Sequence, residues 1–575
     1  MTPVRRVRPS DLEWPSVSQW AALSAQVDGQ LSRLRSPLAA CESASDAADC
    51  AATLTNLKNP YFIRDQAALT QTLGWVDAWT SVPSVYAVAA KNTRHVVAAV
   101  NFAREHKLRL VIKGGGHSYQ GTSCAPDSLL LWTRGLDAVV MHDAFVPTGC
   151  ADVQAPQPAV TVGAGAIWMH VYNAVTTKVG RYVQGGGCGT VGVAGLVQSG
   201  GFGSFSKRYG TAAASLLEAE VVTADGVVRI ANACTHPDLF WALKGGGGGT
   251  FGVVTNLTLR THDLANYFGG AFVAIKANSD TTFRGLIRRF VGFYSKTLFN
   301  PSWGEKVAFD SDNTLRVGMV FQGLDREQAL AVWRPFLDEL AASPDEFTIT
   351  PAPMIAAIPA RSFWDPKFLK QNLSTLVVSD SRPGAPEDNV YWRGDADQVA
   401  QYIYGYRSAW LPATLLEPDR QVELAEAIFA ATRHWSVALH FNKGLAGASK
   451  DAIAASRDTA TNPVVLDAFA LAICAGEGSL LHPALPDRLP DSALARRRAA
   501  AIRRAMDELL KVAPNVGSYV SESDFFESQW QTSFWGKNYP QLRAVKQRYD
   551  PGGLFVVHHG VGSEEWSPDG FTRLA

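Results

Sequence analysis

The spacing of apolar residues changes from helical to strand-like in the stretch before residue 114. Four apolar residues recur at the spacing of one helix face, and Thr93 stands where a helix cap is expected. They are Val96, Ala99, Val100 and Ala103. Alternating apolar residues in 108–112 then predict a strand, which breaks into consecutive glycines. This part of the chain therefore predicts a helix, a strand and a glycine loop at the end of that strand.

A second glycine-rich stretch also follows two predicted elements, here in the order strand and then helix. A predicted strand at 160–162 and a predicted helix that contains Trp168 and Val171 precede the glycine-rich region 185–203. Glycine loses more conformational freedom in a helix than any other residue, so a regular helix is not expected in that region. We expect a second glycine loop there.

The next pattern is that of a hairpin at 218–230. Asp225 and Gly226 stand between two Val-rich runs, and an Asp-Gly pair favours the tight turn of a two-residue hairpin loop. Five consecutive glycines follow at 245–249, and a strand is predicted from there through Val254 and Leu259. The chain thus contains three separate glycine loops within its first half.

Glycines become rarer after about residue 265. Long helical patterns occur at 326–342, 422–432 and 492–512, and alternating runs between them predict antiparallel strands. In 434–442 the apolar residues share one face and the polar residues the other. The two sets are Trp435, Val437, Leu439 and Phe441, and His434, Ser436, His440 and Asn442. This pattern predicts a half-buried sheet that presents polar groups to a binding site.

Length and charge restrict the class of protein and of partner. A chain of 575 residues exceeds what one hydrophobic core usually supports, so two large domains are expected. Lys plus Arg and Asp plus Glu both number 53, without a long run of one sign, which argues against nucleic acid and an acidic membrane surface as partners. No segment approaches the roughly 20 apolar residues that span a bilayer. A small-molecule partner is favoured.

The N-terminus and the cysteines leave the compartment open. Residues 1–19 contain no apolar signal core, although the basic residues near the start would also suit a chain whose signal has been removed. A secreted or periplasmic location then competes with a cytoplasmic one. Seven cysteines leave at least one unpaired or modified. Cys41 and Cys50 form either a disulfide, which would favour an oxidising compartment, or two reduced surface thiols.

The glycine loops suggest a phosphate site without proving one. Backbone N–H groups approach a diphosphate closely only where no Cβ intervenes, so three such loops could enclose one dinucleotide. Glycine runs also serve as flexible turns. The segment 200–203 lacks the spacing and the acidic residue of a Rossmann fingerprint.

Residues within these loops carry a specific family resemblance. The segment 114–118 with Gly121 resembles the flavin-attachment segment of vanillyl-alcohol-oxidase and p-cresol-methylhydroxylase-type FAD proteins. The segments 187–195 and 199–203 resemble the second attachment segment of their berberine-bridge-enzyme branch. The resemblance continues at 207–210, 238–242, 249–254, 549–551 and 554–555, and covers about 80–260 and 515–560.

The resemblance implies FAD bonded to the protein twice, through His117 at the flavin 8-methyl carbon and through Cys188 at carbon 6. Outside these motifs, His117 would be an ordinary loop imidazole and Cys188 a small buried apolar residue. Two links imply a raised reduction potential and an open groove for a bulky substrate. Val191 matches a position where a small residue admits oxygen in related enzymes, which favours an oxidase.

Sixteen residues are expected at the cofactor. They are Gly114, Gly115, Gly116, His117, Ser118, Gly121, Cys188, Val191, Gly192, Gly195, Gly200, Gly201, Gly203, Gly252, Val254 and Phe555.

The acid/base residue is less well defined. Related enzymes carry a Tyr-x-Asn segment by the flavin, and the matching stretch here has Ser521 in place of Asn, so Tyr519 and Glu522 are both candidates. Tyr402, Tyr404 and Tyr406 are expected on one face of a strand, and Tyr402 and His440 are further candidates for substrate contact, against ordinary packing roles. His558 and His559 lack the partners of a metal site, so no metal is expected.

The resemblance implies an α+β fold with a two-subdomain FAD-binding domain of the p-cresol methylhydroxylase type. Residues 1–265 and 512–575 would form that domain, and 266–511 a substrate domain with an antiparallel sheet backed by helices. The expected reaction passes hydride from an alcohol, sugar or phenolic secondary metabolite to FAD, with molecular oxygen then giving hydrogen peroxide. The alternatives are a dehydrogenase with another electron acceptor and a flavin-carrying binding protein without turnover.

Overall fold

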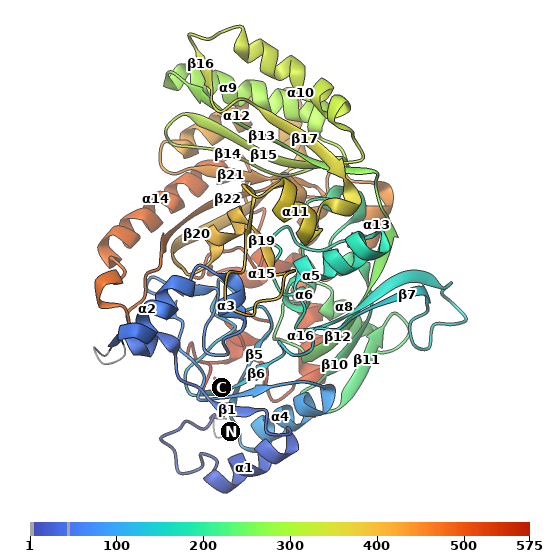
Figure 1. The fold of residues 1–575 in the computed structure, drawn as a ribbon, viewed down its shortest axis with the longest axis vertical. Helices are drawn as coiled ribbons and strands as arrows, with labels where there is room; N and C mark the ends of the chain where they lie inside the picture. The colour runs from blue at the N-terminus through green and yellow to red at the C-terminus, as the bar shows by residue number, and fades with distance from the viewer. Residues whose placement is uncertain (1–4, 43–46, 575) are drawn as a thin grey trace.

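The first glycine loop follows one strand of a four-stranded sheet near the N-terminus. The computed structural model describes residues 5–42 and 47–574. The strand order is β1-β4-β6-β5, with parallel pairing of β4 and β5 to β6. Helix α4 packs on this sheet and α1 packs on α4 (Figure 1). The bounds are α1 Val17–Gln26, β1 Leu31–Arg33, β4 Tyr86–Ala89, α4 Thr93–Glu105, β5 Arg109–Lys113 and β6 Ser128–Trp132.

Helix α4 confirms the predicted apolar face but not the predicted cap. All four residues of that face are buried. The N-cap is Asn92, whose side chain accepts a hydrogen bond from the backbone N–H of His95, and Thr93 is the first helical residue. Asn caps a helix at least as well as Thr, so the helix begins one residue earlier than expected.

The second sheet has six strands, and the second and third glycine loops connect to strands of this sheet. Its order is β11-β10-β12-β8-β7, with β9 paired to β12, and all pairings are antiparallel. The predicted hairpin is confirmed as β10 and β11, with Gly226 at φ +78° in the turn. The strands are β7 Val139–Phe145, β8 Gln157–Gly163, β9 Arg181–Val183, β10 Leu216–Val222, β11 Val228–Asn232 and β12 Val253–Asp263.

Short helices connect these strands. The predicted helix at Trp168 is α5, which continues as a π-helix over Asn173–Val179. The glycine-rich region 185–203 is mostly loop, as predicted, but it also contains the six-residue helix α6. The helices are α5 Trp168–Tyr172, α6 Val193–Gln198, α7 Ser206–Tyr209 and α8 Pro237–Leu243.

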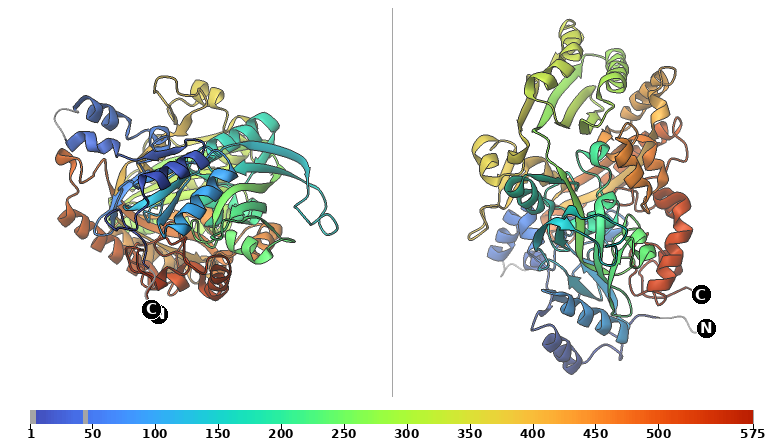
Figure 2. Two further views of the ribbon diagram at one scale, coloured as in Figure 1. Left: turned by 90° about the horizontal axis from the view of Figure 1, so that it is seen from below. Right: turned by 90° about the vertical axis from the view of Figure 1, so that its right-hand side faces the viewer.

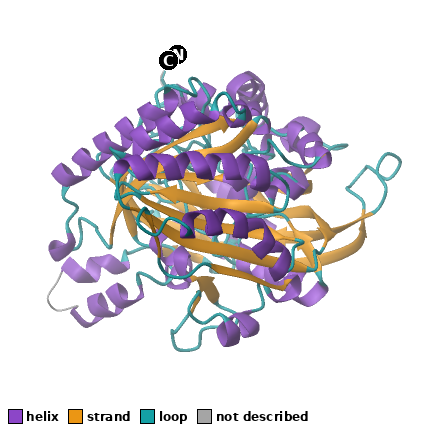
Figure 3. Cartoon of the chain, turned by 90° about the horizontal axis from the view of Figure 1, so that it is seen from above, coloured by secondary structure: helices purple, strands orange, loops and turns teal. Residues whose placement is uncertain are grey.

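A ten-stranded sheet dominates the rest of the molecule (Figures 1 and 3). Its order is β16-β13-β15-β14-β21-β22-β20-β2-β3, with β17 on β13, and only the β2–β20 pairing is parallel. Helices α9, α12 and α14 pack beside one another along it. The strands are β2 Thr72–Trp75, β3 Trp79–Thr80, β13 Tyr267–Ala277, β14 Trp303–Phe309, β15 Thr314–Gln322, β16 Phe347–Ile349, β17 Met354–Pro359, β20 Gln401–Pro412, β21 Val437–His440 and β22 Ala468–Ser479.

The helical patterns predicted after residue 265 are confirmed. They correspond to α10, α12 and α14, and α9 precedes them. The strand predicted at 434–442 is shorter, because β21 covers only its centre and a 3₁₀ turn takes its end. The bounds are α9 Asp280–Phe293, α10 Arg326–Ala341, α12 Gln421–Thr432 and α14 Ser492–Leu510. Strands β2 and β3 join this sheet although they belong to the N-terminal part of the chain. The domain boundaries at 265 and 512 stay predictions.

The remaining elements surround these sheets. The two ends of the described chain lie side by side (Figure 2), where the Arg6 guanidinium donates hydrogen bonds to the carbonyl oxygens of Gly553 and Leu554. Among residues 5–42 and 47–574, no helix is both long and apolar enough to span a bilayer. The remaining bounds are α2 Ala47–Asn56, α3 Pro60–Arg64, α11 Pro366–Asn372, β18 Val377–Ser379, β19 Val390–Trp392, α13 Lys450–Arg457, α15 Trp530–Trp535 and α16 Tyr539–Tyr549.

Two disulfides cross-link the chain. Cys41 pairs with Cys50, which decides between the two alternatives left open by their spacing. Cys150 pairs with Cys234, a link between the β7–β8 connection and the loop after β11 that the sequence did not indicate. Disulfides of this kind are typical of oxidising compartments. Cys188 takes part in neither disulfide.

A buried lysine ties the glycine loops to the large sheet. The Lys207 ammonium of α7 donates hydrogen bonds to the carbonyl oxygens of Gly444 at 2.7 Å, Ala446 at 2.6 Å and Phe469 at 3.1 Å. All three of its N–H donors are therefore satisfied within the protein.

We expect Lys207→Met to lower the free energy of unfolding by about 3 kcal/mol or more, because three buried carbonyl oxygens lose their donor. Lys511→Met is the matched control, since that side chain is 66% exposed, and its effect should stay within about 0.5 kcal/mol. Denaturant-induced unfolding measures both. Equal losses in the two variants would contradict the role given to Lys207.

Candidate active site

The first and second glycine loops contact each other through their backbones. A Cβ on Gly115 would lie 2.7 Å from the Gly192 nitrogen, and a Cβ on Gly192 would lie 2.8 Å from the Gly115 nitrogen. Neither position accepts a larger residue unless the backbone moves. The contact therefore holds the segment with His117 against the segment with Cys188.

His117 and Cys188 lie on either side of one hydroxyl group. Thr190 Oγ1 is 3.2 Å from His117 Nε2 and 3.6 Å from Cys188 Sγ. Burial lowers the pKa of His117 to about 4 and raises the pKa of Cys188 well above its usual value. At neutral pH the imidazole is therefore uncharged and the thiol keeps its proton. The structure thus brings the two predicted attachment residues together as a pair.

The third glycine loop lies beside the second. A Cβ on Gly248 would lie 3.8 Å from Gly195 Cα, whereas a Cβ on Gly195 would meet no atom within 4 Å. Gly245 has φ +117°, and its carbonyl oxygen accepts a hydrogen bond from Trp535 Nε1 at 3.0 Å. The second loop therefore contacts both of the others, and its Gly195 faces open space.

This arrangement fits the FAD that the resemblance implies. Gly195 is exposed, and a Cβ there would meet no atom within 4 Å, so no side chain covers its peptide groups. Glycine peptides of this kind can bind a diphosphate, and the adjoining imidazole and thiol have the chemistry to bond to a flavin ring. The residues able to hold the cofactor are those of 114–118, 187–195 and 245–249.

The other predicted cofactor residues divide into loop and core positions. Gly116, Gly121, Gly200 and Gly201 have positive φ, and Gly203 approaches the Gly185 carbonyl so closely that no Cβ fits. Ser118 Oγ accepts hydrogen bonds from Thr122. Val191 is half-buried next to the Cys188 loop. These positions shape the loops, and their contact with a cofactor stays a prediction.

Gly252, Val254 and Phe555 belong to packed parts of the protein. A Cβ on Gly252 would lie 2.7 Å from Val221 of β10. Val254 and Phe555 are buried in hydrophobic clusters. The structure gives each a packing role, and direct cofactor contact stays a prediction for them as well.

Glu522 lies among polar and aromatic side chains close to the paired loops. Lys443 Nζ donates hydrogen bonds to both of its carboxylate oxygens, at 2.6 Å and 2.5 Å. The rings of Tyr119 and Tyr406 lie 5.2 Å apart. Burial raises the pKa of both phenols, and the negative charge of Glu522 raises it further. This group combines a hydrogen-bonded carboxylate with two aromatic rings, as a site for a hydroxylated substrate requires.

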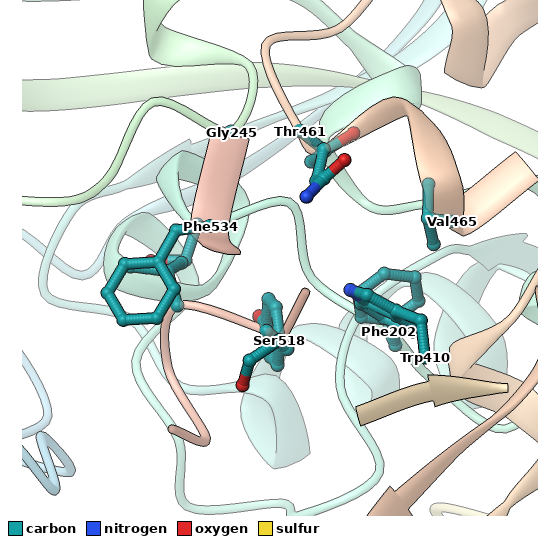
Figure 4. A pocket seen from close by; sticks show the side chains of 11 residues that line it. Phe202, Gly245, Trp410, Thr461, Val465, Ser518 and Phe534 are labelled. Carbon is teal, nitrogen blue, oxygen red and sulfur yellow. The ribbon is translucent and has the colours of Figure 1, made fainter. Parts of the chain in front are cut away.

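Tyr519 has a more enclosed environment than Glu522. Its ring makes an edge contact with Phe202 at 5.1 Å, and it lines a cavity of about 10 Å³ that holds no more than one water molecule (Figure 4). Burial raises the pKa of Tyr519, and Glu522 adds to that effect. The cavity is too small for a substrate, so a substrate could reach Tyr519 only from outside it.

A β-bulge separates the three tyrosines of β20. The pairing with β22 shifts just before Gly405. Tyr402 and Tyr404 belong to a hydrophobic cluster that reaches α14, whereas Tyr406 packs next to Tyr119. The prediction that all three share one face is wrong, because the extra residue of the bulge reverses the alternation.

The structure separates Tyr402 from the group around Glu522, whereas His440 lies close to it. The Tyr402 hydroxyl is 3.2 Å from Thr80 Oγ1, within the α14-side cluster. His440 on β21 pairs with Lys306 on β14, and burial lowers its pKa well below the usual value, with Lys443 and Lys306 adding to the shift. Substrate contact by either residue stays a prediction.

Two carboxylates beside the Cys188 loop were not expected from the sequence. Glu305 of β14 accepts a hydrogen bond from Ser204 Oγ at 2.5 Å and has φ +67°, a strained conformation for its residue type. Asp395 Oδ2 accepts a hydrogen bond from the Gly189 N–H at 3.0 Å. Neither lies in a motif. By contrast, Lys443 could have been found, because it follows the polar face of 434–442.

The histidine pair near the C-terminus is part of an aromatic stack. The His558 ring lies 3.7 Å from that of Phe525, and the His559 ring lies 5.3 Å from that of Trp530. Burial lowers the pKa of His559 to about 3, and His558 adds to the shift. Both are therefore neutral packing residues at neutral pH.

Comparison with known sequences identifies two matching families. Residues 84–232 match the family described as FAD binding domain, and residues 518–562 match that described as berberine and berberine like. The FAD-linked oxidoreductase malF of Malbranchea aurantiaca is 30% identical over 598 residues, which cover 99% of this chain and 94% of that protein. The VAO-type flavoprotein oxidase VAO615 of Thermothelomyces thermophilus is 29% identical, with 100% and 95% covered.

Solved structures show the same fold along the whole chain. The crystal structure of the VAO-type flavoprotein MtVAO615 from Myceliophthora thermophila matches with a TM-score of 0.79 and 26% identity, and covers 99% of this chain and 100% of that one. A glucooligosaccharide oxidase from Acremonium strictum, described with a 6-S-cysteinyl, 8α-N1-histidyl FAD, matches with a TM-score of 0.62 at 18% identity and covers 84% of this chain and 92% of that one. The chain belongs to the berberine-bridge-enzyme-like FAD-linked oxidoreductases of the vanillyl-alcohol oxidase flavoprotein family.

Proposed function

We propose that this enzyme is an oxidase with FAD bonded to both His117 and Cys188. It would remove hydride from a C–H group of an alcohol, a sugar or a phenolic secondary metabolite, and molecular oxygen would accept the electrons to give hydrogen peroxide. The observation that carries the proposal is the position of Thr190, with the imidazole and the thiol on either side of its hydroxyl.

Double attachment requires both side chains to face one ring system. The backbone contact between Gly115 and Gly192 favours this arrangement, because it restricts how far the two segments can separate. The two links named for the Acremonium oxidase are of the same kinds. Bound FAD supplies a two-electron acceptor. The peptides of 114–118, 187–195 and 245–249 would hold its diphosphate and ring.

Glu522 is the proposed base that takes the substrate hydroxyl proton. It is a carboxylate with two hydrogen bonds from Lys443, and it lies next to Tyr119 and Tyr406, whose rings would hold an apolar or sugar ring by stacking. Tyr519 is the second candidate. Because its pKa is raised, the Tyr519 phenol keeps its own proton at neutral pH and is a weaker proton acceptor there, unless the cofactor changes its surroundings.

The attachment is tested by denaturing the protein in acid. We expect the precipitated wild-type protein to remain yellow. His117→Ala and Cys188→Ala should each keep one link, and the double variant should release all its flavin. A colourless wild-type pellet would contradict the proposal.

The base is tested with any alcohol, sugar or phenol that bleaches the wild-type flavin. Glu522→Gln removes the proton acceptor and should slow flavin reduction by about 100-fold or more, measured by stopped-flow absorbance. Glu527→Gln is the matched control, because its carboxylate accepts a local hydrogen bond from the Gln529 N–H. An unchanged rate in Glu522→Gln, with Tyr519→Phe inactive, would transfer the role to Tyr519.

Oxygen use is tested without a substrate. After chemical reduction of the flavin, wild-type protein mixed with oxygen should reoxidise and release hydrogen peroxide, whereas a dehydrogenase would reoxidise slowly. Val191→Leu enlarges a side chain next to the Cys188 loop and should slow reoxidation about tenfold or more. Val228→Leu, at an exposed position of β11, should leave the rate unchanged.

A further inference from the structure

Asp395 reaches the Cys188 loop from a different part of the chain. It belongs to a short 3₁₀ helix, Arg393–Gln398, and is only 7% exposed. Its Oδ2 accepts a hydrogen bond from the N–H of Gly189, the residue that follows Cys188, at 3.0 Å. The carboxyl group is thereby fixed beside the thiol-bearing residue and cannot rotate freely.

The carboxyl group and the thiol affect each other's protonation. Burial is the main cause that raises the pKa of the Cys188 thiol, and the charge of Asp395 raises it further. Burial also raises the pKa of Asp395, to about 7, against the opposing effects of hydrogen bonds with Gly189 and Cys188. The charged groups that face Asp395 are Glu305, which raises this pKa, and Lys306, which lowers it. A carboxylate of this kind accepts a proton at neutral pH far more readily than an exposed one.

His117 is the competing proton acceptor near the thiol. It contacts Cys188 only through the Thr190 hydroxyl, and burial lowers its pKa to about 4. One of its two ring nitrogens would also be bonded to the flavin and could then no longer take a proton. Asp395 therefore combines the better basicity with a position that attachment leaves free.

We propose that Asp395 is the base that removes the thiol proton of Cys188 when its sulfur bonds to the flavin. This inference rests on the proposed double attachment. In the step, the thiol proton passes to Asp395, the S–C bond forms at ring carbon 6, and the hydrogen on that carbon leaves as a proton. The two electrons released pass to molecular oxygen, which takes up two protons to become hydrogen peroxide.

The test follows the Cys188 link by mass spectrometry. Proteolytic digests of freshly purified protein, and of samples taken during aerobic incubation, report flavin on the His117 and Cys188 peptides separately, and alkylation reports free Cys188 thiol. Asp395→Asn keeps an acceptor for the Gly189 N–H but loses the basic oxygen. We expect it to form the Cys188 link at least 100-fold more slowly while the His117 link stays complete.

Two variants serve as controls. Asp397→Asn changes an exposed carboxylate on the same short helix and should link Cys188 as the wild type does. Asp395→Glu restores a carboxylate and should recover most of the linking. A wild-type rate in Asp395→Asn would overturn the proposal, and so would loss of both links, which would assign Asp395 to loop folding. A wild-type protein with free Cys188 would instead overturn the double attachment itself.

Discussion

The contact between Gly115 and Gly192 is the constraint on which the site depends. Each glycine lies so close to the backbone nitrogen of the other that neither tolerates a Cβ. Because His117 follows one of these glycines and Cys188 precedes the other, the contact sets the separation of an imidazole and a thiol. Thr190 occupies the space between them and hydrogen-bonds to His117. The reactive pair is thus positioned by backbone packing, with little reliance on side-chain contacts.

The large sheet and the segments that adjoin it supply the polar groups around this pair. Asp395 and Glu305 approach the Cys188 loop from the segment between β19 and β20 and from β14, and Lys443 follows β21. Lys207 anchors the loops to the same sheet through three carbonyl oxygens. A shift of the sheet relative to the loops would therefore disturb attachment, proton transfer and stability together.

Local patterns predicted the elements well, and motifs predicted the paired residues. The periodicity of α4, α12 and α14, the Asp225-Gly226 hairpin and the glycine loops all follow from neighbouring residues. The bulge in β20 could not be predicted, because it arises from pairing with β22 and leaves no mark in the alternation of tyrosines. Asp395, Glu305 and the Cys150–Cys234 disulfide depend on contacts between distant segments, and no motif surrounds them. Tyr402 was favoured by residue type alone, and its environment is set by packing toward α14.

A crystal structure of the protein with its bound flavin tests the central claim most directly. We predict continuous electron density from the His117 imidazole and from the Cys188 sulfur to one ring system, with the diphosphate next to the exposed peptide of Gly195. A flavin separated from either side chain by a non-bonded distance, at full occupancy, would contradict it.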